Sequence, residues 1–135
     1  MKELRIEAKV DNLQKVLSFV DVEMEALGCT PKAIMQMDIA VEEIFVNIAH
    51  YAYAPGSGHA VIKVDNDADP TSIVVSFADE GMPFDPLARD DPDTTLSADE
   101  RRIGGLGIFM VKKGVDDIHY EFKDHQNVLT IRKNV

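Results

Sequence analysis

The sequence has few cysteines and no long apolar run. Its single cysteine, Cys29, excludes a disulfide bond within the chain and fits a reducing compartment. No stretch of about 18 apolar residues occurs, so we expect no transmembrane helix. The opening segment MKELRIEAKV alternates between apolar and charged residues and lacks the apolar run of a signal peptide. These absences predict a soluble, cytoplasmic protein.

Basic residues are also scarce. The chain has 14 Lys and Arg residues against 24 Asp and Glu residues, which gives a net charge of -10. A protein that binds the phosphate backbone of nucleic acids carries a basic face, so we expect no direct contact with nucleic acid. The deficit does not exclude a nucleotide, because one local pocket can bind a nucleotide in an acidic protein.

Two common metal and phosphate motifs are missing from the sequence. The histidines do not have the spacing of a zinc site; they are His50, His59, His119 and His125. The chain also has no Walker A segment, which excludes a P-loop. Any nucleotide site must therefore be built from other residues.

The apolar residues predict a single domain, residues 1–135. The chain has the usual length of one domain, and a 45% share of apolar residues is enough to form its core. Alternating patterns predict five strands, at residues 4–8, 59–66, 71–79, 117–124 and 127–134. Helical spacing predicts a helix that ends at Gly28 and a second one with Thr30 as N-cap and Pro31 at its first position. A short third helix is predicted to end at Gly114.

The late strands are predicted to form hairpins, the last of which turns at His125, Gln126 and Asn127. We therefore expect an α+β fold, a two-layer sandwich in which helices cover one face of a mixed, mostly antiparallel sheet. Residues 80–103 do not follow this pattern, since they contain Pro83 and other prolines among scattered aspartates. Such a long irregular segment is typical of a lid or of a disordered stretch.

The segment VEEIFVNIAHYAY reads as a buried helix, yet it carries polar residues. Glu43 and Asn47 are four residues apart, so they share one helix face, offset from the apolar stripe. An amide oxygen is a suitable Mg²⁺ ligand, and a neighbouring carboxylate can orient a hydroxyl group or a water molecule. The helix alone favours the simpler alternative, that both side chains are solvated at its edge. Glu42 lies on a different face, and His50 and Tyr51 fit packing or hydrogen-bonding roles.

The segment FADEGMPFDP follows an apolar strand. Asp79, at the strand end, can accept a hydrogen bond from an exocyclic amine such as that of adenine. Gly81 would let the backbone come close to a flat ligand. A turn of this composition is also a common way to end a strand, so the segment alone does not establish a site.

The segment RRIGGLGIFMVKK places Gly104, Gly105 and Gly107 directly before a predicted helix. Free N–H groups at a helix start bind anions, and glycines permit close approach. The alternative is a flexible joint between a loop and a helix. The segment is not the dinucleotide-binding fingerprint, which should follow a strand.

Taken in this order, the three segments resemble the motifs of the ATP-binding domain of the histidine-kinase-like (GHKL) superfamily. Within it, the chain looks most like the stand-alone anti-sigma-factor serine/threonine kinases. The likeness covers nearly the whole chain: EEIFVNIAHYAY stands at the N-box, ADEGMPFDP at the first glycine box and GGLGIFMVKKGVDD at the second. The resemblance implies a Bergerat-type ATP-binding fold.

The resemblance also implies residue roles. Glu43 would be the general base or would orient the attacking hydroxyl group, and Asn47 would coordinate the Mg²⁺ that bridges the ATP phosphates. Asp79 would bind the adenine amino group, with Gly81 beside it. The second glycine box would wrap the phosphates as a lid at about residues 80–103 closes; its residues are Gly104, Gly105, Leu106 and Gly107. From their position before these glycines, Arg101 or Arg102 would reach the γ-phosphate.

Two positions depart from the family pattern. The group often has His-Ala-Tyr or His-Gly-Tyr after the asparagine, whereas this chain has Tyr51-Ala52-Tyr53 with His50 one place earlier. The wider superfamily often has a second glycine where this chain has Pro83. The second change fits the anti-sigma group, while the first affects the surroundings of an intact Glu43 and Asn47.

The function implied is that of an ATP- and Mg²⁺-dependent serine/threonine kinase that regulates transcription by partner switching. Its partners would be a sigma factor and an anti-anti-sigma (antagonist) protein, and the family implies a homodimer. Phosphorylation of the antagonist on a serine would add about two negative charges and change its affinity.

Two alternatives remain open at this point. One is a non-catalytic ATP-binding module that sequesters a protein partner. The other is a catalytic fragment of a histidine kinase, which the near absence of residues before the first strand disfavours.

Overall fold

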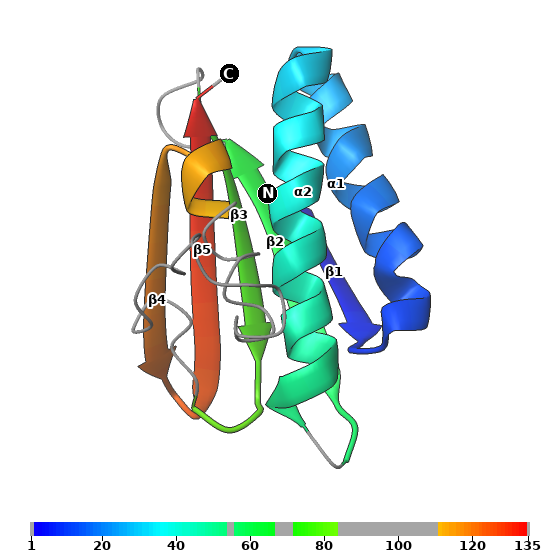
Figure 1. Cartoon of the computed structure of the whole chain (residues 1–135), viewed down its shortest axis with the longest axis vertical. Coiled ribbons are helices and arrows are strands. Elements are labelled where there is room, and N and C mark those ends of the chain that lie inside the picture. The colour runs from blue at the N-terminus through cyan, green and yellow to red at the C-terminus, as the bar shows by residue number, and fades with distance from the viewer. Residues whose placement is uncertain (1, 54–55, 67–71, 84–110, 135) are drawn as a thin grey trace, which may run out of the picture.

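A five-stranded antiparallel sheet with helices packed on one face forms the described part of the chain (Figure 1). The computed structural model describes residues 2–53, 56–66, 72–83 and 111–134. The strand order is β1-β2-β3-β5-β4, with β1 at Lys2–Glu7, β2 at His59–Asn66, β3 at Ser72–Asp79, β4 at Asp117–Lys123 and β5 at Gln126–Asn134. Every pairing among these strands is antiparallel, so the predicted α+β sandwich is confirmed and its sheet is not mixed.

The two long helices are α1 (Leu13–Ala26) and α2 (Pro31–Asn47), which lie side by side over the sheet (Figure 1). A short 3-10 turn, Val10–Asn12, precedes α1. Gly28 adopts a φ of 78° directly after α1, a left-handed conformation that suits glycine at a helix end. No helix in the described ranges is both long and apolar enough to cross a membrane.

The second helix begins and ends in different ways. Its start matches the prediction, because the Thr30 side chain accepts a 3.1 Å hydrogen bond from the backbone N–H of Ala33 and Pro31 is the first helical residue. Its end continues into a π-helical turn, η2 (Ile48–Ala52), which the sequence pattern did not predict. Such turns are rare and are frequent at functional sites.

The core lies between the helices and the sheet. Its largest fully buried side chains come from both layers: Val16, Val20 and Met24 of α1, Met37, Val41, Ile44 and Phe45 of α2, and Ile62, Ile73, Val75, Phe77 and Ile131 of the sheet. This packing fixes the rotation of α2 about its axis. Because Glu43 and Asn47 are offset from these buried positions, both are only partly buried, at the border of the apolar face of α2.

A short helical turn at residues 111–114 follows the part of the chain that is not described. The Nζ atom of Lys133 donates a 2.8 Å hydrogen bond to the carbonyl of Gly114, at the end of this turn. A lysine at a helix end satisfies a carbonyl group that has no partner within the helix. Gly114 is therefore confirmed as the end of this turn, and β5 holds it in place.

The predicted turn of the last hairpin is wrong by one or two residues. The turn is made by Asp124 and His125, whose φ angles are 53° and 63°. Two successive left-handed residues form the type of tight turn that matches the twist of a hairpin, and Asp and His tolerate that conformation better than most residues. Gln126 and Asn127 therefore belong to β5, and Asn127 pairs in register with Asp79 of β3.

Two carboxyl groups face one another between the helices. Asp38 of α2 lies against Asp21 of α1, and one oxygen of each is buried without a hydrogen-bond donor among the described residues. Burial, the adjacent Asp21 and then Glu42 raise the pKa of Asp38 to about 7. The folded protein therefore keeps a proton at this site that the unfolded chain releases at lower pH.

We expect Asp38→Asn to stabilise the protein at pH 8 and to have little effect at pH 4, close to the ordinary pKa of an aspartate. The folded-state pKa is raised, so the stability present at low pH is lost progressively as the pH rises from 3.8, the ordinary value, to about 7. The gain should be about 1 kcal/mol, below the ~4 kcal/mol of three full pKa units, because solvent screens a part-exposed carboxyl group. Urea unfolding at both pH values measures it, with Glu25→Gln as a surface control. Equal effects at the two pH values would contradict the assignment.

Candidate functional site

Figure 1 shows the end of α2 beside the lower ends of β3 and β5. An open pocket is lined by residues of these elements and of η2. It encloses about 490 Å³ of free space, counting its solvent-filled mouth. Its walls combine apolar side chains with a few polar groups, the usual composition of a site for a small ligand. The described residues that line it are Ile44, Asn47, Ile48, Tyr51, Ala52, Phe77, Asp79, Met82, Tyr120, Asn127 and Leu129. Asn47 and Asp79, predicted from two separate segments, therefore lie in one pocket.

Glu43 and Asn47 interact directly. The Nδ2 atom of Asn47 donates a 3.1 Å hydrogen bond to Oε1 of Glu43, one helical turn earlier. Because this bond uses the amide nitrogen, the amide oxygen is the atom of Asn47 that is suited to a cation. Asn47 lines the pocket, whereas Glu43 lies behind it and positions its amide.

The pocket suits a cation that arrives with its own ligands. The described residues contain no group of three His, Cys, Asp or Glu side chains that could hold a metal ion. Mg²⁺ in nucleotide sites takes only one or two protein ligands and completes its shell with water and phosphate oxygens. The amide oxygen of Asn47 fits that kind of site, so the donor set agrees with Mg²⁺ bound together with a nucleotide.

Glu43 has the electrostatic environment of a base. Burial raises its pKa above that of an ordinary glutamate, the hydrogen bond from Asn47 lowers it, and the charge of Glu42 raises it again. A carboxylate with a raised pKa takes up a proton more readily near neutral pH. Glu42 itself is exposed, as its different helix face predicted.

Asp79 is the last residue of β3 and is only 5% exposed. Its Oδ1 atom accepts 2.9 Å hydrogen bonds from the backbone N–H of Gly81 and from Nδ2 of Asn127. Burial raises the pKa of Asp79, and these two hydrogen bonds lower it. The result is a buried acceptor at the base of the pocket, as the prediction for an amine-binding carboxylate requires.

Gly81 is needed because the chain packs closely against Ala52 at this position, which was not predicted. A Cβ atom at this position would lie 2.2 Å from the carbonyl oxygen of Ala52, far inside van der Waals contact. The backbone N–H of Met82 donates a 3.1 Å hydrogen bond to that same oxygen. The glycine thus lets the chain after β3 pack against η2, and Gly81 is not among the described residues that line the pocket.

Tyr53 ties three segments together beside the pocket. Its hydroxyl group donates a 2.6 Å hydrogen bond to the carbonyl of His59 and accepts a 2.7 Å bond from the N–H of Glu80. Its ring also fills the space beside Gly58, where a Cβ atom would meet it. The segment Tyr51-Ala52-Tyr53 differs from the family pattern, and its Tyr53 fixes the end of η2 to β2 and to the chain after β3.

His50 and Tyr51 lie at the outer end of the same turn. Both are exposed, and their rings stand edge to face with centroids 6.0 Å apart. Tyr51 also lines the pocket, whereas His50 does not appear in the described lining. The packing or hydrogen-bonding roles that the sequence favoured for these two residues stay predictions.

Two pocket residues, Asn127 and Tyr120, were not predicted. Asn127 is 6% exposed and accepts a hydrogen bond from the hydroxyl group of Tyr120 through Oδ1. The sequence analysis placed Asn127 both in the turn and at the start of the strand at residues 127–134. Alternation along that strand puts Asn127 on the inward face with Leu129 and Ile131, and this was the signal that could have found it.

Several predicted site residues lie outside the described residues. They are Arg102, Gly104, Gly105, Leu106 and Gly107. The same holds for residues 84–103 of the predicted lid and for Arg101. Their roles stay predictions.

Comparison with known proteins assigns the family. A family model described as a histidine kinase-like ATPase domain matches residues 6–133. The serine-protein kinase RsbW of Listeria monocytogenes is 28% identical over 106 residues, which cover 76% of this chain and 67% of the relative. The serine/threonine-protein kinase BtrW of Bordetella bronchiseptica is 25% identical over 95 residues, which cover 70% of this chain and 66% of the relative.

A solved structure supports the fold. The histidine kinase AdeS of Acinetobacter baumannii superposes with a TM-score of 0.51 at 13% sequence identity, over 99% of this chain and 68% of that chain. An identity this low carries information on the fold alone. Together with the match over residues 6–133, these findings show that the chain belongs to the histidine kinase-like ATPase family.

Proposed function

We propose that this protein is an ATP- and Mg²⁺-dependent serine/threonine protein kinase, acting as an anti-sigma factor. It would phosphorylate a serine of an anti-anti-sigma protein and so regulate a sigma factor by partner switching. One observation carries the proposal: Asn47, hydrogen-bonded to a partly buried Glu43, shares a pocket with the buried acceptor Asp79. The names of RsbW and BtrW as protein kinases add support from similar sequences.

Each part of ATP has a proposed neighbour in the chain. Asp79 would accept a hydrogen bond from the adenine amino group, with Gly81 beside it as the residue that seats the loop. Asn47 would hold Mg²⁺ through its amide oxygen, and the ion would supply positive charge to the phosphates. The second glycine box would wrap the phosphates, and Arg102 would reach the γ-phosphate; the residues of the box are Gly104, Gly105, Leu106 and Gly107.

The transfer itself needs little covalent chemistry from the protein. The serine oxygen attacks the γ-phosphorus, the bond from that phosphorus to the bridging oxygen of ADP breaks, and ADP leaves. Glu43 orients the hydroxyl group and takes up its proton. The raised pKa of Glu43, caused mainly by burial, suits a group that accepts a proton near neutral pH.

The test is phosphotransfer to a candidate antagonist. The protein is mixed with Mg²⁺ and γ-labelled ATP and with the small antagonist-like protein encoded nearest to its gene. We expect label on a serine of that protein, and none when ATP or Mg²⁺ is left out. ATP binding without transfer to the antagonist would overturn the kinase proposal and support the non-catalytic module that sequesters a partner.

Sedimentation of the protein alone and with its partners tests the proposed assembly. We propose a homodimer that binds the sigma factor and, in exchange, the antagonist. The excess of acidic residues, 24 against 14 basic ones, suits a partner with a basic surface.

A further inference from the structure

We propose that Asn127 and Tyr120 are positioning residues that orient Asp79 and thereby set the base specificity of the pocket. The inference rests on the proposed function, since it assumes that the pocket holds the base of a nucleotide. It assigns a role to two residues of the β4–β5 hairpin, behind the carboxylate that meets the ligand.

Asn127 is placed by the sheet. It lies opposite Asp79 in the β3–β5 register, and its side chain is buried on the pocket side. Its Nδ2 atom donates 2.9 Å hydrogen bonds to Oδ1 of Asp79 and to the carbonyl of Met82, and lies 3.4 Å from the carbonyl of Gly81. One amide nitrogen thus faces three acceptors around the end of β3.

The acceptors at the end of β3 set which way this amide points. The reverse orientation would place the amide oxygen against the carboxylate of Asp79 and the carbonyl of Met82, where only acceptors face it. The oxygen is therefore turned toward β4, where the hydroxyl group of Tyr120 donates to it. Tyr120 thus satisfies the amide oxygen of Asn127 and holds the amide in this orientation.

The consequence for Asp79 is chemical. Its Oδ1 atom already accepts from Asn127 and from Gly81, so Oδ2 is the oxygen left for a ligand. Donors on Oδ1 also favour the ionised form of this carboxyl group, since they lower its pKa against the effect of burial, which raises it. An ionised carboxylate only accepts hydrogen bonds, so it matches the amino group of adenine and repels a carbonyl oxygen at the same place.

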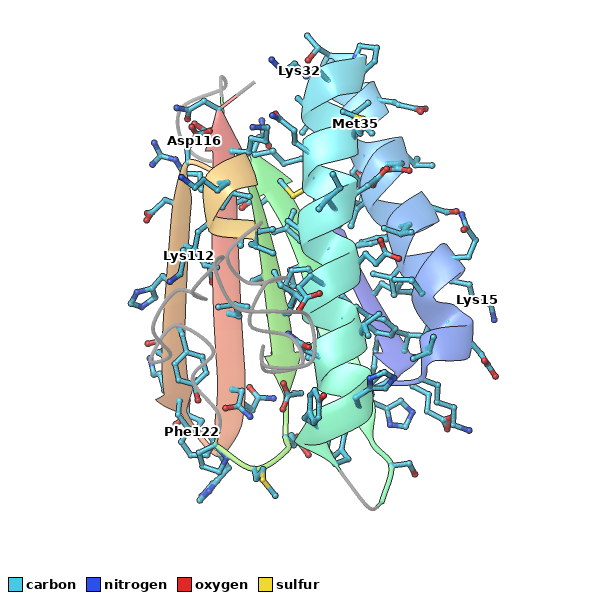
Figure 2. All side chains as sticks on the ribbon, in the orientation of Figure 1. Lys15, Lys32, Met35, Lys112, Asp116 and Phe122 are labelled. Atoms are coloured by element: carbon cyan, nitrogen blue, oxygen red, sulfur yellow. The ribbon has the colours of Figure 1, made fainter. Side chains whose placement is uncertain are left out.

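Asn127 also holds the rim of the pocket. Its bond to the carbonyl of Met82 fixes the backbone of a residue whose side chain lines the pocket and is 60% exposed. Phe122, which pairs with Asn127 across the hairpin, is 43% exposed at the same end of β4 (Figure 2). Loss of Asn127 would therefore release both the carboxylate and the rim beside it.

The test compares two nucleotides that differ at one position of the base. ATP presents an amino group there and inosine triphosphate presents a carbonyl oxygen. We expect Asn127→Leu, which has a similar volume and no donor, to weaken ATP about 10- to 100-fold and inosine triphosphate much less. The preference for ATP should therefore fall about tenfold or more. Tyr120→Phe should change the preference in the same direction by a smaller factor.

Controls separate this role from general damage and from a failure of the proposed function. Thr130 is a partly exposed residue of β5 whose side chain lies on the opposite face of the sheet from that of Asn127. Thr130→Val should therefore leave the affinities for both nucleotides unchanged. Asp79→Asn should abolish the preference. If Asp79→Asn does so while Asn127→Leu and Tyr120→Phe keep the wild-type preference, the positioning role is overturned and the proposed function stands. Equal losses for both nucleotides would also overturn it. A wild-type protein that binds no ATP would overturn the proposed function itself.

If Asn127→Leu does not fold, Tyr120→Phe alone tests the positioning role. This substitution removes only the hydroxyl group that donates to Asn127 and leaves the amide of Asn127 in place. Circular dichroism and thermal unfolding of each variant report on folding before the nucleotide titrations are made. A folded Tyr120→Phe variant with an unchanged ratio of ATP to inosine triphosphate affinity contradicts the proposal.

Discussion

Glu43→Gln is expected to slow phosphoryl transfer about 10²- to 10⁴-fold, the usual effect of losing a general base, while ATP affinity stays within a few-fold of wild type. Glutamine keeps the size of the side chain and an oxygen that can accept the hydrogen bond from Asn47. It cannot take up a proton from the attacking serine. The measurement is single-turnover transfer to the antagonist, together with a nucleotide titration of the same variant.

The pH dependence of the wild-type protein tests the same assignment. Burial raises the pKa of Glu43, so the rate should fall as the pH drops through a value above that of an ordinary glutamate. The exposed Glu42 contributes to that raised pKa. Glu42→Gln should therefore leave the maximal rate unchanged and move the acidic limb of the profile to lower pH. Full activity of Glu43→Gln at any pH would show that the base lies elsewhere.

The second large effect concerns the metal. Asn47→Ala should weaken ATP binding in the presence of Mg²⁺ at least about tenfold, as loss of a group at a metal site commonly does. Its residual binding should no longer depend on Mg²⁺. The fold should persist, because the side chain is only half-buried and its hydrogen-bond partner, Glu43, lies on the same helix.

Calorimetric titration with ATP in Mg²⁺ and in a chelator measures this effect. Lys32→Ala is the matched control, because it changes an exposed residue at the opposite end of α2 (Figure 2). It should behave as wild type in both conditions. Binding of Asn47→Ala that keeps the wild-type dependence on Mg²⁺ would remove Asn47 from the metal site.

Local sequence patterns predicted the parts of the fold that local forces determine. Thr30 and Pro31 mark the start of α2 because capping depends on neighbouring residues. Alternation located β2 and β3, and helical spacing set Glu43 and Asn47 on one face. The fold class followed from the order of these elements, and the placement of Asn47 and Asp79 in one pocket followed from it.

The missed features depend on contacts between distant segments. Asn127 belongs to the pocket because of the register of β5 on β3, and a turn assigned one or two residues too late hid that register. Gly81 is required by the carbonyl of Ala52, which comes from a π-helical turn without a clear sequence signal. Both contacts join segments that are far apart in the sequence, so neither could be predicted from the residues next to the site.

The strand order has a consequence for how the binding site comes into being. β5 follows the other four strands in the chain, yet it is inserted between β3 and β4 and brings Asn127 to Asp79, 48 residues earlier. During synthesis, the half of the pocket around Asp79 therefore stays incomplete until the β4–β5 hairpin has docked. A ligand that binds only the completed pocket stabilises the docked hairpin by mass action. A nucleotide that binds this pocket would then act on the nascent protein as a folding ligand.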